Sequence, residues 1–228
     1  MLVVIPARGG SKGIPGKNTK LLTGRPLIAY AIDCARSVAE DVDICLSTDA
    51  PAIKQVAEAE DLYVPFLRPA HLAADSSGTY EVLLHALEHY AAAGREYDDL
   101  LLLQPTSPLR RPEHVRKAVS AYLDNRPEML VSVKESSANP YYTLFEENAN
   151  GYLRKSKKGD FIRRQDCPPV YEYNGAIYVI NVEALKKKPL HKMERIVKFI
   201  MDTRSSVDLD TMEDWAYVEF LLGRGGNK

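Results

Sequence analysis

Cysteine is scarce in this 228-residue chain, and neither sign of charge is in excess. The three cysteines, Cys34, Cys45 and Cys167, are far apart and form no Cys-x-x-Cys motif. This argues against a disulfide framework or a zinc site and fits a reducing compartment. Lys and Arg total 30 and Asp and Glu total 31, whereas a protein that binds nucleic acid in bulk usually carries a basic excess. We therefore expect no nucleic-acid partner.

Long apolar runs are also missing. The longest uncharged apolar stretches are well short of the roughly 20 residues that span a bilayer. The chain starts with a strand-like run at Leu2, without a basic leader or an apolar signal segment. The sequence therefore predicts a cytoplasmic protein with no membrane association. Its length and its 45% hydrophobic content suit one domain over residues 1–228, with at most a small excursion.

Short apolar runs alternate with amphipathic stretches along the chain. The pattern predicts strands at 2–5, 42–47, 63–67, 100–103, 130–133, 174–182 and 196–201, and helices at 26–37, 51–60, 79–93, 113–123 and 211–222. This alternation is typical of an α/β protein with a mostly parallel sheet. Ligands of such sheets bind beyond the carboxyl ends of the strands, so we expect the site in the loops 6–18, 47–50, 68–79, 104–111 and 202–210. The polar, turn-rich segment 136–170 breaks the pattern and is expected to leave the sheet.

The loop after the first strand has the composition of a phosphate-binding loop. Its glycines allow sharp turns and close approach to a ligand, and its exposed N–H groups can form an anion-binding nest. Arg8, Lys12 and Lys17 add positive charge, and Ser11 and Asn18 add neutral polar groups. The loop is not a Walker A motif, which would need glycine at 11 and a hydroxyl at 18. A solvated basic turn is the alternative.

Asp208 and Asp210 stand two residues apart near the end of the chain. In an extended segment their side chains point the same way. Adjacent carboxylates repel each other unless a cation lies between them, and Mg²⁺ at phosphate-transfer sites is usually held by one or two carboxylates. The alternative is that Asp210 caps the helix that starts near Thr211.

Two further loops carry polar side chains at the expected edge of the sheet. Gln104, Thr106 and Ser107 follow the 100–103 strand in a loop stiffened by two prolines, and a rigid turn plus a helix cap is the alternative there. The 68–79 loop offers Arg68 for a phosphate and small polar residues for a base, although helix capping explains Ser77 and Thr79 equally well.

A His-x-x-Glu-His pattern occurs at residues 85–89 and matches an inverted zinc-protease motif. No third metal ligand is evident, and so short a pattern often arises by chance. The two histidines are expected on one face of a half-exposed helix.

Seven motifs in this order resemble the acylneuraminate cytidylyltransferase family, the CMP-sialic acid synthetases. The resemblance runs along nearly the whole chain and rests on residues 5–13 with Pro15, Lys17 and Asn18, and on 47–49, 67–70, 103–110, 163–165, 174–178 and 208–210. It implies a Rossmann-like three-layer nucleotidyltransferase fold and a homodimer in which 136–170 is the dimerisation segment.

The resemblance also implies a role for each site residue. The triphosphate of CTP would be held by Arg8, Gly10, Ser11 and Lys17, and the nucleoside by Asn18, Arg68, Ser77 and Thr79. The sugar would face Gln104, Thr106, Ser107, Arg164 and Tyr178. Asp208 and Asp210 would bind Mg²⁺, with Mn²⁺ as a substitute, and Arg8, Lys17 and the two aspartates would act in catalysis.

The activity implied is transfer of CMP from CTP to the anomeric hydroxyl of a nine-carbon 2-keto sugar acid, N-acetylneuraminate or a relative, with release of pyrophosphate. Many bacterial members carry a basic residue where this chain has Glu172, which leaves the sugar open. The alternatives are the same reaction on Kdn, legionaminate, pseudaminate or Kdo, a sugar-1-phosphate nucleotidyltransferase, and a non-catalytic nucleotide-binding regulator. The paired aspartates argue against the regulator.

Overall fold

The fold is built on one six-stranded sheet, which we describe from a computed structural model covering residues 1–73 and 78–223. The strand order is β10-β6-β9-β5-β1-β4, and all pairs are parallel except those made by β9. The strands are β1 (Leu2–Pro6), β4 (Ile44–Ser47), β5 (Asp99–Leu103), β6 (Met129–Glu135), β9 (Tyr171–Asn181) and β10 (Ile196–Ile200). The mostly parallel sheet predicted from the sequence is confirmed.

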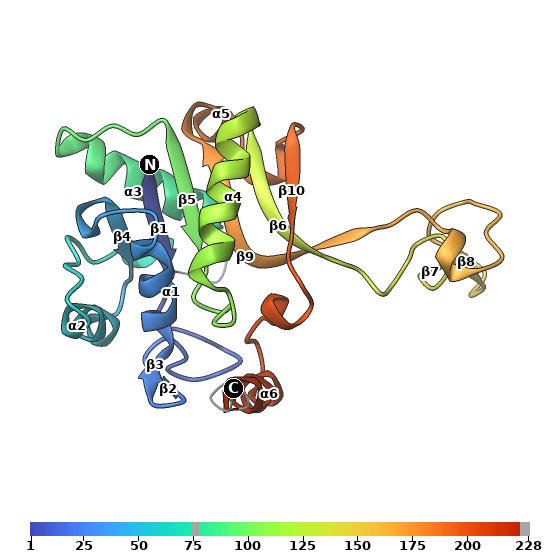
Figure 1. The fold of residues 1–228 in the computed structure, drawn as a ribbon, viewed down its shortest axis with the longest axis horizontal. Helices are drawn as coiled ribbons and strands as arrows, with labels where there is room; N and C mark the ends of the chain where they lie inside the picture. The colour runs from blue at the N-terminus through green and yellow to red at the C-terminus, as the bar shows by residue number, and fades with distance from the viewer. Residues whose placement is uncertain (74–77, 224–228) are drawn as a thin grey trace.

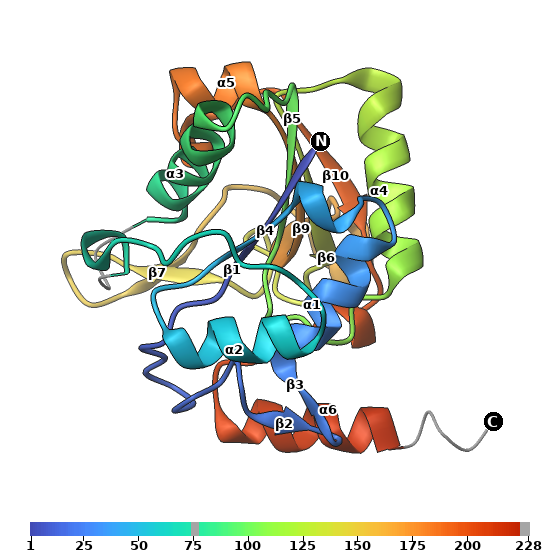
Figure 2. The same ribbon diagram turned by 90° about the vertical axis from the view of Figure 1, so that its left-hand side faces the viewer.

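Helices cover both faces of this sheet and give it three layers (Figures 1 and 2). One face packs against α1 (Leu27–Arg36), α2 (Pro51–Ala59) and α4 (Pro112–Asn125). The other packs against α3 (Thr79–Ala92) and α5 (Val182–Lys187). The continuously buried β1, β4 and β5 follow from this double cover, because a strand buried on both faces needs apolar residues throughout. In the part of the chain described, each helix is too short or too polar to cross a bilayer.

A third apolar cluster lies beyond the carboxyl edge of the sheet. Trp215 of α6 (Met212–Gly223) packs there with Ile14, Leu22 and Leu209, and the small hairpin of β2 (Leu21–Leu22) and β3 (Arg25–Pro26) lies beside α6. Because Ile14 belongs to the glycine loop and Leu209 to the two-aspartate segment, this cluster holds two distant parts of the sequence together.

The segment 136–170 extends away from the sheet as an arm, with a short hairpin of β7 (Phe145–Glu147) and β8 (Leu153–Lys155) at its end (Figure 1). Several of its large apolar side chains are exposed: Leu144, Phe145, Tyr152, Leu153 and Ile162. That the arm forms a dimer contact stays a prediction.

The expected strand at 63–67 is wrong. These residues are extended, but they pair with none of the described strands, and just after them the Arg68 N–H donates to the carbonyl of Thr48, the residue that follows β4, at 2.7 Å. Pro65 has no N–H to donate, which breaks any ladder through it. The sequence also did not predict α5, the β2–β3 hairpin or the antiparallel direction of β9.

Candidate active site

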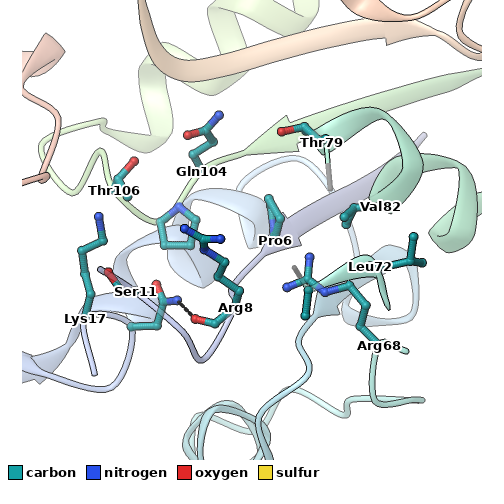
Figure 3. A pocket seen from close by; sticks show the side chains of 14 residues that line it. Pro6, Arg8, Ser11, Lys17, Arg68, Leu72, Thr79, Val82, Gln104 and Thr106 are labelled. Carbon is teal, nitrogen blue, oxygen red and sulfur yellow. Dashed lines mark hydrogen bonds between the residues drawn. The ribbon is translucent and has the colours of Figure 1, made fainter. Parts of the chain in front are cut away.

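A pocket of about 360 Å³ opens at the carboxyl ends of β1 and β5, where the fold class predicts a ligand. Four of its lining residues come from the glycine loop: Arg8, Ser11, Lys17 and Asn18. Four more predicted site residues complete the wall: Arg68, Thr79, Gln104 and Thr106. Figure 3 shows Lys17, Ser11 and Thr106 at one end, Thr79, Val82 and Leu72 at the other, and Arg8 between them. The structure therefore brings four separate segments of the sequence to one pocket.

Contacts from Asp49 and from the far end of the glycine loop itself hold its backbone in place. The Gly9 N–H donates to Asp49 Oδ1 at 2.9 Å, and Asn18 Nδ2 donates to the Arg8 carbonyl at 3.0 Å. A side chain at Gly9 would lie 2.8 Å from the Ala50 Cβ, so the loop can approach α2 only with glycine there. Asp49 does not cap α2, whose N-cap is Ala50 without a side-chain bond; it fixes the loop instead.

Leu209 is the point where three walls of the site meet. Its N–H donates to the Thr106 carbonyl at 2.9 Å, its carbonyl accepts from Lys17 Nζ at 2.5 Å, and its side chain is buried. A Cβ added to Gly13 would collide with the Asp210 carbonyl. These contacts fix the two-aspartate segment against both the glycine loop and the Gln104 loop.

The environments of the two aspartates differ, yet both fit a cation. Burial raises the pKa of Asp208, the nearby Thr106 hydroxyl opposes this rise, and the neighbouring Asp210 carboxylate adds to it. Asp208 Oδ1 is a buried oxygen without a hydrogen-bond partner, while the Asp210 side chain is 75% exposed and lies 3.6 Å from Lys17 Nζ. A buried carboxylate oxygen without a donor, beside a second carboxylate, is the kind of group that a divalent cation satisfies.

Asp210 does not cap the last helix. That function belongs to Thr211 and Asp214: the Asp214 carboxylate accepts from the Thr211 N–H and hydroxyl, both at 2.8 Å, and from the Asp210 N–H at 3.1 Å. The Thr211 hydroxyl in turn accepts from the Asp214 N–H at 3.2 Å, which completes a reciprocal cap. The capping alternative for Asp210 is therefore wrong, and its carboxylate faces solvent and Lys17.

Arg68 brings a buried positive charge into the pocket. It is only 6% exposed, its nearest acidic partner is Asp49 at 3.6 Å, and two of its nitrogens, Nε and Nη2, are buried without a hydrogen-bond partner. Burial lowers the pKa of Arg68 despite that carboxylate. Because a buried guanidinium with incomplete hydrogen bonding is costly, this site favours a bound anion.

The loop after β5 is positioned by a fully buried arginine. Arg110 Nη1 donates to the carbonyl of Gln104 at 2.9 Å and to that of Ala176 in β9 at 2.7 Å. Ser107 is buried with its hydroxyl unpartnered and does not line the pocket, whereas Thr106 does. Gln104 is thus held at the boundary between this pocket and a second one.

The second pocket, of about 740 Å³, shares Gly78, Thr79 and Gln104 with the first. Tyr178, for which a sugar-binding role is predicted, lines it, and so does Tyr173, which the sequence did not indicate. The N-cap of α3 is Gly78 without a side-chain bond, so Thr79 is not a capping residue and faces both pockets.

Two more predicted residues, Arg164 and Gly10, line neither pocket. Arg164 is exposed at the base of the arm and lines a separate surface pocket with Cys167, away from the site within one chain. Gly10 is exposed and lines neither pocket, and Ser77 lies outside the described residues. Glu172, the departure noted in the sequence, forms a 2.8 Å ion pair with Lys134 and lines neither pocket.

The two histidines of the zinc-like pattern pack on an aromatic ring. Phe66 lies 4.9 Å from the His85 ring and 4.5 Å from the His89 ring. Among the described residues, no group of three or more His, Cys, Asp or Glu side chains is placed to hold a metal ion. The His-x-x-Glu-His residues therefore do not form such a group.

The helices on both faces of the sheet and the basic pocket at its carboxyl edge define a nucleotide-binding α/β protein. The chain belongs to the cytidylyltransferase family, whose sequence model matches residues 2–219, and it is a nucleotidyltransferase. The family indicated by the sequence motifs is thereby confirmed.

Individual relatives agree with this assignment. The chain is 34% identical to the CMP-N,N'-diacetyllegionaminic acid synthase of Legionella pneumophila, over 97% of this chain and 96% of that protein. It is 32% identical to an N-acylneuraminate cytidylyltransferase of Streptococcus agalactiae serotype V, over 95% of this chain and 52% of that protein. Its fold is similar to that of CMP:2-keto-3-deoxy-manno-octonic acid synthetase complexed with CTP, with a TM-score of 0.72, 19% identity and 98% of both chains covered.

Proposed function

We propose that this chain transfers CMP from CTP to the anomeric hydroxyl of a nine-carbon 2-keto sugar acid and releases pyrophosphate. One observation supports this most: two adjoining pockets meet at Gln104 and Thr79, one basic and next to paired aspartates, the other large and lined by tyrosines. A nucleotide and a sugar must lie side by side for this transfer, and the relatives named above act on acids of this kind.

The basic pocket would hold CTP. Arg8, Lys17 and Arg68 supply three positive charges around one cavity, which suits a polyphosphate. Their main contribution is to position the α-phosphorus in line with the sugar hydroxyl and to stabilise the charge that develops on the leaving pyrophosphate. Asn18 and Thr79 would contact the nucleoside, although the amide nitrogen of Asn18 is already bonded to the Arg8 carbonyl.

Asp208 and Asp210 would hold Mg²⁺, or Mn²⁺ in its place, because hard carboxylate oxygens suit both ions. The fit rests on the unpartnered buried oxygen of Asp208 next to the exposed Asp210. Bound there, the ion would polarise the α-phosphate as a Lewis acid. Lys17, which contacts both Asp210 and the Leu209 carbonyl, would keep these carboxylates next to the triphosphate.

We also propose that the protein is a homodimer that assembles through the arm. Phe145, Leu153 and Ile162 are 48%, 68% and 88% exposed on a segment that leaves the sheet. Exposed apolar clusters of this kind commonly mark protein contacts. Arg164 would then reach a site only across the dimer. The cytoplasmic location expected from the sequence stays a prediction.

Pyrophosphate release from CTP and Mg²⁺, measured with a panel of 2-keto sugar acids, tests the activity. We expect release that depends on both the sugar and the metal, and we expect Asp210→Ala to abolish turnover in a folded protein. No release with any of the sugars would refute the proposal, and CTP binding by calorimetry without release would instead favour a nucleotide-binding regulator. Near-normal rates of Asp210→Ala at saturating Mg²⁺ would refute the metal site.

A further inference from the structure

A buried amide joins β9 to the segment that carries the two aspartates. Asn174 is 5% exposed and Ser206 is 3% exposed, and neither residue lines either pocket. Asn174 Nδ2 donates to Ser206 Oγ at 2.9 Å, and Ser206 Oγ donates to the Asp202 carbonyl at 2.7 Å. Ser206 ends the short 3-10 helix Arg204–Ser206 and precedes Asp208 by two positions. The aspartate segment therefore begins at a side-chain hydrogen bond from the central sheet.

A bulge in β9 fixes the orientation of the Asn174 side chain. Residues 174–177 lie opposite the single residue Ser132 of β6, because the regular pairing of the two strands is interrupted there. The Ser132 hydroxyl donates to Asn174 Oδ1 at 2.6 Å and accepts from the Ile177 N–H at 2.7 Å. Asn174 Oδ1 also accepts from the Ala176 N–H at 3.2 Å. Since a backbone N–H can only donate, the amide oxygen must face the bulge, and the amide nitrogen reaches the aspartate segment.

The same bulge contacts the loop after β5. The Ala176 carbonyl accepts from Arg110 Nη1, which also holds the Gln104 carbonyl. Gly175 has a φ of +72°, a conformation that favours glycine, and a Cβ built on it would lie 3.7 Å from Gln104 Oε1. Gln104 lines both pockets. The bulge thus fixes the residue between the pockets on one side and, through Asn174, the start of the aspartate segment on the other.

The backbone around Asp208 is held at two points. On the carboxyl side the Leu209 N–H donates to the Thr106 carbonyl, and on the amino side Ser206 accepts from Asn174. If the amino-side contact is lost, the backbone can shift the buried Asp208 carboxylate while the Leu209 contact remains. Groups that orient a metal ligand without touching the metal typically change metal affinity or activity by about 10–100-fold when they are removed.

We propose that Asn174 is a positioning residue. Through Ser206 it keeps the metal-binding carboxylate of Asp208 in register with Gln104 and the two pockets. The proposal rests on the proposed cytidylyl transfer and its metal site, and it gives neither Asn174 nor Ser206 a contact with substrate or metal. It predicts that loss of this hydrogen bond weakens metal binding more than it weakens binding of the nucleotide.

Ser206→Ala tests the link with the smallest change, because it removes one hydroxyl from a buried position. Bound Mn²⁺ is measured by electron paramagnetic resonance with CTP present and no acceptor, so that the measurement does not depend on turnover. We expect Mn²⁺ to bind about tenfold or more weakly than in wild type. The Mg²⁺ concentration for half-maximal pyrophosphate release should rise by a similar factor. The KM for CTP at saturating Mg²⁺ should change little, because the basic side chains of the nucleotide pocket are untouched.

Ser205→Ala is the matched control. Ser205 is 6% exposed in the same turn, and its N–H and hydroxyl both donate to the Asp202 carboxylate at 2.8 Å. This variant also removes one buried hydroxyl, so it should lower Tm about as much as Ser206→Ala does, but it should keep the wild-type affinity for Mn²⁺.

A double variant tests whether the two side chains act through one bond. Asn174→Ala should weaken Mn²⁺ binding at least as much as Ser206→Ala. Asn174→Ala combined with Ser206→Ala should bind Mn²⁺ no more weakly than Asn174→Ala alone, because each change removes the same hydrogen bond. Circular dichroism confirms that each variant is folded, and if Asn174→Ala does not fold, the comparison of Ser206→Ala with Ser205→Ala decides.

Wild-type Mn²⁺ affinity in Ser206→Ala would overturn the proposal, and so would an equal loss in Ser205→Ala. Additive losses in the double variant would show that Asn174 does not act through Ser206, which would also overturn it. A wild-type chain that binds Mn²⁺ and CTP but releases no pyrophosphate with any acceptor would refute the proposed transfer, while the comparison of Mn²⁺ affinities would still decide the role of Asn174.

Discussion

Asp208→Asn should make the metal-free protein more stable and at the same time inactive. Asparagine has the shape of aspartate but no charge. Asp208 Oδ1 is buried without a hydrogen-bond partner and the Asp210 carboxylate is near, so the wild-type charge is unfavourable when no cation is bound. Because asparagine removes the charge but keeps a buried polar atom at this position, the gain should be at most about 1 kcal/mol. For a chain of this length, that corresponds to a rise in Tm of at most about 2–4 °C.

Turnover should respond in the opposite direction. Metal ions stabilise the transition state by several kcal/mol, so removal of one ligand should lower kcat by about 100-fold or more. The assays are thermal unfolding without metal and pyrophosphate release at saturating Mg²⁺. Wild-type Tm should rise when Mg²⁺ and CTP are added, because ligands that bind only the folded state stabilise it, and this rise should be smaller in Asp208→Asn.

The control is Asp33→Asn, which removes an exposed ion pair with Arg25 and should cost at most about 1 kcal/mol without affecting turnover. The reasoning would be refuted if Asp208→Asn were clearly less stable than wild type without metal, or if it kept near-normal turnover.

The pH dependence has a definite sign. Because the folded state raises the pKa of Asp208, the folded state binds this proton more tightly than the unfolded state does. The metal-free wild type should therefore lose stability as pH rises from the ordinary pKa of aspartate through the raised value, and Asp208→Asn should lack this loss. Mg²⁺ competes with the same proton, so its affinity should fall as pH falls through that range.

Three further variants probe the contacts that build the site. Gly13→Ala should lower both kcat and Tm, since its Cβ would collide with the Asp210 carbonyl and push that backbone away from the glycine loop; normal kinetics would show that this contact is not needed. Arg110→Met leaves the Gln104 and Ala176 carbonyls without their donor and should cost about 2–6 kcal/mol in urea unfolding, at about 1–3 kcal/mol for each of the two groups left unpaired. Arg68→Met should raise the KM for CTP by about tenfold or more, while the unliganded protein stays as stable as wild type. The reason is that the buried charge of Arg68 lacks full pairing until an anion binds. An unchanged KM would remove Arg68 from the nucleotide site.

Much of the fold could be predicted because local signals and long-range packing agree. The buried strands β1 and β5 are continuously apolar, and the helices between strands are amphipathic, so the alternation defined an α/β sheet. The 63–67 segment has the same kind of composition. It nevertheless stays outside the sheet, and Pro65 has no N–H to donate to a neighbouring strand. The direction of β9 had no local signal, since an apolar strand looks the same whether its neighbours run parallel or antiparallel.

The sequence by itself determined the glycine loop, the paired aspartates and the family, because these depend on residue types at short spacings. Only the tertiary structure decided how they act together: Leu209 joins Lys17 to the Thr106 loop, and Asp49 fixes the glycine loop instead of capping α2. It also placed Tyr173 beside Tyr178, which strand alternation alone would have separated. The physical reason is that hydrogen bonds and packing between distant segments depend on the register and bulges of the sheet, and these arise only when the whole core assembles.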